Sequence, residues 1–171
     1  DHLISYYTLI NKNPLVKITL NNTLKNRNIK LFTDKHRLRQ IISNLMSNAC
    51  KFTQEGFVEL GITLDAKYLT IYVKDTGIGI SPQNINYLFE RFRKLTEEKK
   101  GKIIRGIGLG LAISKQLAEL IGGNLTVESE ENKGSAFIFK IESKNIITEN
   151  EILQPLTNQI NSKKWKNKNI L

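Results

Sequence analysis

Three segments rich in asparagine and glycine follow one another within residues 44–111, and they constrain this chain more than any other feature. Residues 44–53 read NLMSNACKFT, residues 75–80 read DTGIGI, and residues 106–111 read GIGLGL. Glycine lets a ligand approach the backbone closely, and the start of a helix favours an anion. Each segment alone says little, but the ordered set predicts a nucleotide pocket.

The composition fits a single domain with polar tails. The chain has 171 residues, 40% of them hydrophobic, which is enough for a sizeable core. No stretch approaches the roughly 20 apolar residues of a membrane helix, and the start carries no signal-peptide pattern. The single cysteine, Cys50, suits the cytoplasm, and with only two histidines beside it a structural zinc site is not expected. We expect a cytoplasmic domain and leave open whether its parent protein is membrane-anchored.

A net charge of +10 raises the question of a nucleic-acid partner. Two groups of lysines lie in a polar tail at residues 163–168 and in one stretch at residues 94–105. That stretch has no interleaved aromatic residues on which bases could stack, and the tail has only Trp165. We therefore predict no nucleic-acid partner, and interpret the charge as a nucleotide-facing loop and a solvated tail.

The pattern of apolar residues predicts an α+β fold, a two-layer α/β sandwich. Asp34 is a plausible N-cap for a helix over residues 35–52. Pro82 opens a short helix to about residue 89, and residues 109–121 form a third, stopped by two glycines. Strands are expected at residues 15–20, 29–33, 57–64, 68–74, 125–128 and 136–141. About three helices should thus cover a mixed, mostly antiparallel sheet.

Two regions fall outside these elements. Residues 93–107 are polar and charged, and a loop of that length in a compact domain is more often functional than accidental. We interpret it as a lid over the pocket. Beyond about residue 143 the sequence turns rich in Asn, Lys and Ser, which is typical of a linker. Residues 1–14 are left without an element because Pro14 interrupts any helix there.

The predicted helix at residues 35–52 carries the first candidate site residues. Asn44, Asn48 and Lys51 stand at i, i+4 and i+7 and share one face. An asparagine buried without a partner costs roughly 1–3 kcal/mol, and a magnesium ion bridging phosphates is one partner for its oxygen. Asparagine on a solvated helix surface is the alternative. Lys51 favours the ligand interpretation because it adds the positive charge that phosphates need.

Asp75 and the glycines after it are the second candidate set. A carboxylate there can accept a hydrogen bond from an exocyclic amine such as that of adenine, while Gly77 and Gly79 let the base approach the backbone. Taken alone, Asp75 is at least as well explained as an ordinary turn residue. The second glycine run shifts the balance towards a base-binding role.

The third candidate set lies around the last glycine run. Gly106, Gly108 and Gly110 lead into a helix and can present backbone amides to phosphate, although neither a P-loop nor a Rossmann pattern is present. Phe89 and Phe92 are best explained as core residues that hinge the lid, with base stacking the less favoured interpretation. Flanking side chains that could neutralise phosphate are those of Arg91, Arg93, Lys94 and Arg105.

These motifs resemble the catalytic and ATP-binding domain of sensor histidine kinases, a member of the GHKL superfamily with a Bergerat-type fold. The four resembling boxes are residues 44–53, 75–80, 89–92 and 106–111, in the family's order. Residues 133–137, which read KGSAF, resemble the family's closing hairpin. The resemblance spans roughly residues 28–142.

The resemblance implies ATP and Mg²⁺ as cofactors and a role for each site residue. Asn48 would bind magnesium, Asn44 would lie near the phosphates, and Lys51 would contact phosphate, which makes these three the catalytic set. Asp75 would bind the adenine amine and Gly79 would line the base. The implied ATP-binding set comprises Asn44, Asn48, Lys51, Asp75, Gly77, Gly79, Ile80, Phe89, Arg93, Lys94, Arg105, Gly106, Gly108, Leu109, Gly110 and Leu111.

The resemblance also implies a phosphoacceptor histidine, which this chain lacks. In the family that residue lies in a helical dimerisation hairpin of the form His-Glu-x-x-x-x-Pro, and neither His2 nor His36 has that context. We therefore expect a monomeric fragment that transfers phosphate to a separate hairpin and works with a response regulator or receiver domain. Residues 1–14 would be the lead-in from the hairpin, residues 15–143 the catalytic domain, and residues 144–171 a linker towards a receiver domain of a hybrid kinase.

Two alternatives stay open from the sequence. One is an ATPase of the chaperone or gyrase kind, in which a glutamate general base stands where this chain has Asn44. An amide cannot take a proton from water, which favours transfer to a protein acceptor. The other alternative is a non-catalytic nucleotide-binding module, against which the presence of both Asn44 and Asn48 argues.

Overall fold

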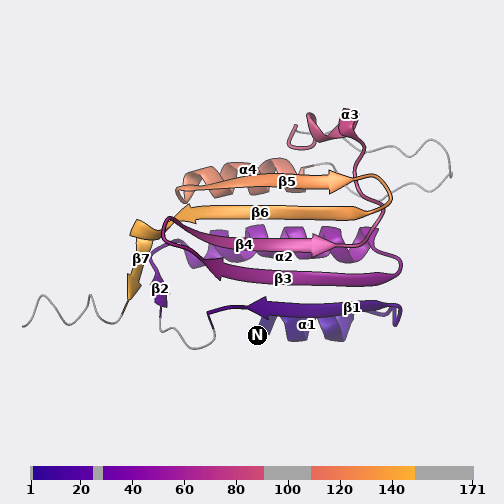
Figure 1. Cartoon of the computed structure of the whole chain (residues 1–171), viewed down its shortest axis with the longest axis horizontal. Coiled ribbons are helices and arrows are strands. Elements are labelled where there is room, and N and C mark those ends of the chain that lie inside the picture. The colour runs from indigo at the N-terminus through magenta and orange to yellow at the C-terminus, as the bar shows by residue number, and fades with distance from the viewer. Residues whose placement is uncertain (1, 25–28, 91–108, 149–171) are drawn as a thin grey trace, which may run out of the picture.

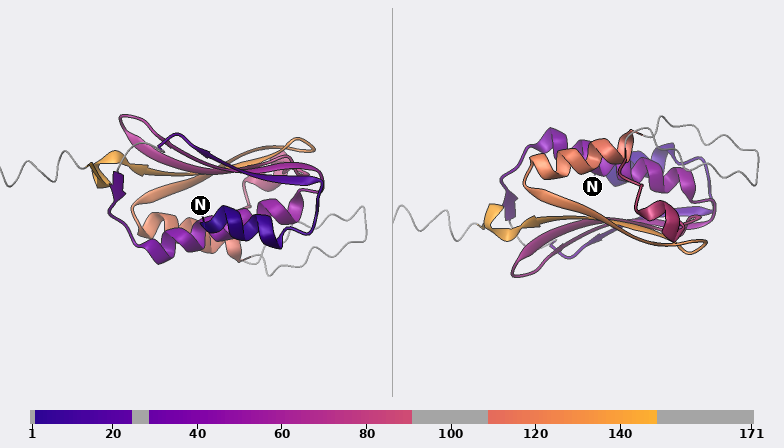
Figure 2. Two further views of the ribbon diagram at one scale, coloured as in Figure 1. Left: turned by 90° about the horizontal axis from the view of Figure 1, so that it is seen from below. Right: turned by 90° about the horizontal axis from the view of Figure 1, so that it is seen from above.

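The computed structural model describes residues 2–24, 29–90 and 109–148, and these form two layers. A five-stranded sheet makes one layer. Helices α1 (His2–Ile10), α2 (Lys35–Phe52) and α4 (Gly110–Leu120) lie together on one face of it, as both views of Figure 2 show. The predicted two-layer α/β sandwich is confirmed.

The sheet has the strand order β1-β3-β4-β6-β5 (Figure 1). Its strands are β1 (Val16–Asn22), β3 (Gly56–Leu64), β4 (Tyr68–Asp75), β6 (Gly134–Glu142) and β5 (Gly123–Glu130). Only the β1–β3 pair is parallel, and the other three pairs in this sheet are antiparallel. This matches the expected mixed, mostly antiparallel sheet.

Side chains alternate between the two faces of each strand, and this alternation builds the core. On the helix-facing side, Ile71 and Val73 of β4 are buried, as are Phe137, Phe139 and Ile141 of β6. Residues between them, such as Lys74 and Lys140, are exposed on the other face. The sheet therefore has one apolar face for the helices to cover and one polar face for solvent.

Helix α2 crosses the centre of that apolar face and has the bounds that the sequence predicts. The Asp34 carboxylate accepts hydrogen bonds from the backbone N–H groups of His36 and Arg37 at 2.9 and 3.1 Å, so it is the N-cap. Five buried side chains anchor the helix to the sheet and to α4: Ile41, Ile42, Leu45, Met46 and Ala49.

Helix α3 (Pro82–Ile85) is shorter than predicted, because after Ile85 the chain continues as turns rather than helix. Within the described ranges no helix combines the length and apolar content needed to cross a bilayer.

Helix α1 lies in the stretch that the sequence left unassigned. It is apolar on nearly all sides, so its residues show no helical periodicity that would separate it from a short strand. Packing decides its state: Tyr7 is buried, and its hydroxyl donates to the backbone carbonyl of Ser43 on α2 at 2.8 Å. The helix ends before Pro14, as the proline requires.

A second, two-stranded sheet joins β2 (Ile29–Leu31) to β7 (Ile146–Thr148) in antiparallel register. The turn Ser143–Asn145 precedes β7, and Ile146 is buried. Residues 146–148 of the predicted linker thus form a strand, since pairing with β2 outweighs their polar surroundings in the sequence. The division of the whole chain into three parts stays a prediction.

Leu45→Ala tests how much of the stability comes from α2 packing on the sheet. Leu45 is 2% exposed, and removing its side chain should lower the free energy of unfolding by about 2–5 kcal/mol. Leu120→Ala on α4 is the matched control, because Leu120 is 63% exposed and should change stability by about 0.5 kcal/mol or less. Urea denaturation followed by circular dichroism measures both, and equal losses would contradict this account of the core.

Candidate nucleotide-binding site

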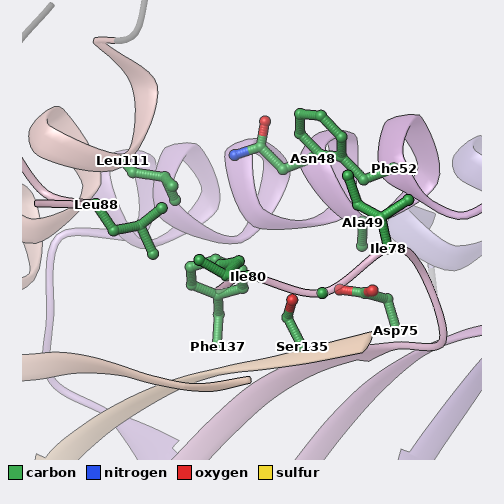
Figure 3. Close-up of a pocket in the computed structure, with 11 residues that line it drawn as sticks. Asn48, Ala49, Phe52, Asp75, Ile78, Ile80, Leu88, Leu111, Ser135 and Phe137 are labelled. Carbon is green, nitrogen blue, oxygen red and sulfur yellow. The ribbon is translucent and has the colours of Figure 1, made fainter. Parts of the chain in front are cut away.

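A cavity of about 530 Å³, a volume that includes the part open to solvent, lies between α2 and the sheet. Figure 3 shows its two walls: Asn48, Ala49 and Phe52 on α2 above, and Asp75, Ser135 and Phe137 on the strands below. The remaining lining residues come from the segment after β4, from the turns after α3 and from α4: Ile78, Gly79, Ile80, Leu88 and Leu111. The lining is mostly apolar, with a few polar groups at defined places, as in most small-molecule sites.

Asp75 ends β4 at the floor of this cavity and is 5% exposed. Its carboxylate accepts a hydrogen bond from the backbone N–H of Gly77 at 2.8 Å, which fixes its orientation. Burial raises the pKa of this carboxyl above its usual value, and hydrogen bonds from the backbone N–H groups of Gly77 and Ser135 oppose that rise only in part. Gly77 thus positions Asp75 and does not itself line the cavity.

The turn between β5 and β6 holds the glycine segment in place. Gly79 has φ +67°, and a Cβ there would overlap the backbone carbonyl of Glu130. The backbone N–H of Asn132 donates to the carbonyl of Ile78 at 2.7 Å, and that of Ile80 donates to Ser129 Oγ at 2.9 Å. Glycine at position 79 is therefore required by both the backbone angle and the close approach of the hairpin.

Asn48 and Asn44 lie one turn apart on α2 but have different surroundings. Asn48 lines the cavity, and within the described part of the chain its side-chain amide makes no hydrogen bond. Asn44 does not line the cavity: its Nδ2 donates to Ser114 Oγ on α4 at 2.8 Å. Ser114 is 2% exposed, so this bond ties α2 to α4 inside the protein.

The start of α4 lies against Asn44. A Cβ at Gly110 would sit 2.5 Å from Asn44 Oδ1, so any other residue there would force the Asn44 side chain to shift. Leu109 is the N-cap residue of α4, and Leu111 in its first turn lines the cavity. The structure thus brings the described end of the second glycine segment to the asparagine helix.

Two further predicted site residues lie away from the cavity lining. Lys51 is exposed, and its Nζ is 4.9 Å from the ring centroid of Phe52, which does line the cavity. Phe89 is partly buried and packs against the core, with Lys115 Nζ 5.8 Å from its ring centroid. Their roles in binding stay predictions. The predicted phosphate-binding residues Arg93, Lys94, Arg105, Gly106 and Gly108 lie outside the described residues, as does the predicted lid.

A family model described as "Histidine kinase-, DNA gyrase B-, and HSP90-like ATPase" matches residues 33–145, about two thirds of the chain. The chain belongs to this ATPase family. Among its relatives is the aerobic respiration control sensor protein ArcB of Escherichia coli K12, 40% identical over 121 residues that cover 70% of this chain and 16% of ArcB. The sensor histidine kinase RcsC of Salmonella typhimurium is 41% identical, covering 66% of this chain and 12% of RcsC.

A third relative, the autoinducer 2 sensor kinase/phosphatase LuxQ of Vibrio parahaemolyticus, is 35% identical over 90% of this chain and 18% of LuxQ. The chain therefore spans less than a fifth of the length of these relatives. Among solved structures, full-length ShkA in complex with AMPPNP matches with a TM-score of 0.66 and 30% identity, covering 86% of this chain and 28% of ShkA. This ATPase domain is thus homologous to the ATP-binding domains of sensor histidine kinases.

Sequence reasoning missed the apolar walls of the ATPase site. Phe52 follows Asn48 by one helical turn, so the shared face that predicted Lys51 could have indicated it. Ser135 and Phe137 alternate on β6 within the segment noted as the closing hairpin, and their spacing places both on the helix-facing side. Ala49, Ile78 and Leu88 carry no chemical signal in the sequence, because apolar residues at such spacing are equally typical of core.

The donor chemistry of the site fits a magnesium ion only if the nucleotide supplies most ligands. In the described ranges no three His, Cys, Asp or Glu side chains gather into a metal site. Asn48 offers one uncommitted amide oxygen at the cavity wall, which is a hard donor of the kind Mg²⁺ accepts. Phosphate oxygens and water would have to complete the shell.

Asp75→Asn tests the effect of the buried carboxylate on stability. Because the folded state raises the pKa of Asp75, it holds the proton more tightly than the unfolded chain does. Wild type should therefore lose stability relative to Asp75→Asn as the pH rises above about 3.9, the pKa of an unfolded Asp, until the folded-state carboxyl has also ionised. Denaturant titrations at several pH values measure this, and a constant difference between the two proteins would refute the raised pKa.

Cys50 provides an independent check on the same charge. Burial raises the pKa of the Cys50 thiol, and the nearby Asp75 carboxylate raises it further. The Asp75→Asn change should therefore lower the pKa of this thiol, which the pH dependence of its alkylation rate would report. Glu128→Gln, at an exposed position on β5, serves as the control and should leave that pKa unchanged.

Proposed function

We propose that this domain binds ATP with Mg²⁺ and donates the γ-phosphoryl group to a histidine on a helical hairpin outside this chain. One observation carries the proposal. In a chain of this ATPase family, a buried carboxylate and an uncommitted asparagine amide stand on opposite walls of one apolar cavity (Figure 3). The first group suits the base of ATP, and the second suits the end that carries phosphate and metal.

At the base end, Asp75 is the recognition group. Its carboxylate is fixed by Gly77 and lies among apolar side chains, so a purine ring can be enclosed there. An exocyclic amine that donates to this carboxylate satisfies a charge that is otherwise buried with only backbone partners. Phe52 and Phe137 provide apolar surface on the two walls.

At the phosphate end, Asn48 would hold the metal and the first turn of α4 would face the phosphates. Magnesium bound there neutralises phosphate charge and orients the transferred group. The bond from Asn44 to Ser114 holds α2 and α4 in register, so the amide and the start of α4 keep a fixed relation. The lid cations predicted from the sequence, Arg93, Lys94 and Arg105, would add charge at the same end.

In the proposed phosphoryl transfer, the residues of the site act mainly by positioning ATP and the metal. Phosphoryl transfer proceeds through a loose transition state, and catalysis comes from alignment and charge neutralisation. An imidazole acceptor is itself the nucleophile, so no carboxylate base beside the γ-phosphate is needed. Asn44 fits this scheme, whereas hydrolysis of the chaperone or gyrase kind would require a base at that position. The partners we propose are accordingly a phosphoacceptor hairpin and, downstream of it, a response regulator or receiver domain.

Calorimetric titration with AMPPNP tests the nucleotide part of the proposal. Wild type should bind in the presence of Mg²⁺, and Asp75→Ala should weaken binding by at least about tenfold, because the base loses its charged acceptor. Glu128→Ala, which removes an exposed carboxylate from the same sheet, should bind like wild type. No binding by folded wild type would overturn the proposed function.

Phosphate transfer in trans tests the catalytic part. With a histidine-containing hairpin from a homologous sensor kinase, the domain and radiolabelled ATP should place phosphate on the hairpin histidine. Asn48→Ala should slow this transfer by about a hundredfold or more and weaken its dependence on Mg²⁺. Ser47→Ala, an exposed neighbour on the same helix, is the control. Unchanged transfer by Asn48→Ala would remove Asn48 from the metal site.

A further inference from the structure

Ser129 on β5 makes three polar contacts that together fix the direction of its hydroxyl proton. Its Oγ accepts from the backbone N–H of Ile80 at 2.9 Å, lies 2.9 Å from the backbone carbonyl of Gly134, and lies 3.0 Å from Ser135 Oγ. A backbone carbonyl cannot donate, so the single proton of Ser129 goes to Gly134. The contact with Ser135 is then a hydrogen bond only if Ser135 donates.

This assignment leaves the Ser135 hydroxyl without a proton for a ligand. Ser135 is directly opposite Ser129 in the β5–β6 pair, is 8% exposed and lines the cavity. Figure 3 shows its hydroxyl oxygen directed into the cavity beside the Asp75 carboxylate. With its proton committed to Ser129, this oxygen presents only lone pairs to the cavity. The floor therefore offers two acceptors side by side and, from these two side chains, no donor.

We propose that Ser129 is a positioning residue that fixes Ser135 as a hydrogen-bond acceptor, and that the floor thereby selects a purine carrying an amino group over one carrying a carbonyl at the same place. An amino group brings two protons to two acceptors. A carbonyl oxygen would face the Asp75 carboxylate and the lone pairs of Ser135 with no proton between them, and unmatched buried acceptors are costly. This inference rests on the proposed nucleotide site and names the residue that sets its base preference.

The test compares ADP with inosine diphosphate, whose base has a carbonyl in place of the amino group of adenine. Calorimetry with Mg²⁺ gives the ratio of the two dissociation constants for wild type and for Ser129→Ala. Loss of the Ser129 oxygen frees the Ser135 proton to turn towards a carbonyl, so the preference for ADP should fall about five- to tenfold. The ring nitrogen next to this group also differs between the two bases, so the measured ratio reports the whole edge of the base that faces Ser135 and Asp75.

Three variants separate positioning from a general structural effect. Ser129→Thr keeps the oxygen and should keep the preference for ADP. In a Ser135→Ala background, Ser129→Ala should change the preference no further, because the residue through which it acts is gone. Thr126→Ala removes an exposed hydroxyl from the same strand and should behave like wild type.

The outcomes distinguish failure of this inference from failure of the proposed function. If folded wild type binds neither nucleotide, the proposed function fails. If wild type prefers ADP and Ser129→Ala keeps the full preference, the role of Ser129 is refuted and the nucleotide site stands. Should Ser129→Ala not fold, Ser135→Ala decides: a reduced preference for ADP supports the acceptor role, and an unchanged one overturns it.

Discussion

The close packing of the β5–β6 hairpin on the glycine segment after β4 is the contact on which this site depends. The backbone of Glu130 packs so close to Gly79 that a Cβ there would overlap the Glu130 carbonyl. Gly134 has φ +109°, and a Cβ there would overlap the carbonyl of Asp75. With side chains at either position the hairpin could not lie over the end of β4. Two glycines far apart in the sequence thus let the hairpin pack beside the buried Asp75.

Side-chain hydrogen bonds hold elements that line the cavity to the elements beside them. Ser114 on α4 accepts from Asn44 on α2, and Ser129 on β5 accepts from the backbone of Ile80. Each bond connects an element that lines the cavity to one beside it. Both hydroxyls are small enough to sit within the packed layers, and each satisfies an N–H that would otherwise be unmatched. The geometry of the site is therefore held by polar contacts just outside its lining.

The sequence predicted best those features that depend on local chemistry. The Asp34 cap and the apolar stripe defined α2 to the residue, because both act within one helix. Features that depend on distant partners were missed: β7 exists because β2 pairs with it, and α1 because Tyr7 reaches Ser43. In the site the same division holds. Asp75 and Asn48 could be proposed as site residues from their residue types and spacing in the sequence. The proposed role of Ser129 depends on its contacts with Ile80, Gly134 and Ser135, which only the fold brings together.

Asn44 shows how packing and chemistry support the same functional choice. Its Nδ2 is committed to the buried Ser114, and its Oδ1 lies where a Cβ at Gly110 would sit only 2.5 Å away. A glutamate here would be one methylene longer and would push a carboxylate towards the first turn of α4. In this chain α2 and α4 are packed around an amide that donates to Ser114, and because an amide cannot take a proton from water, this packing favours the proposed transfer to a histidine over hydrolysis.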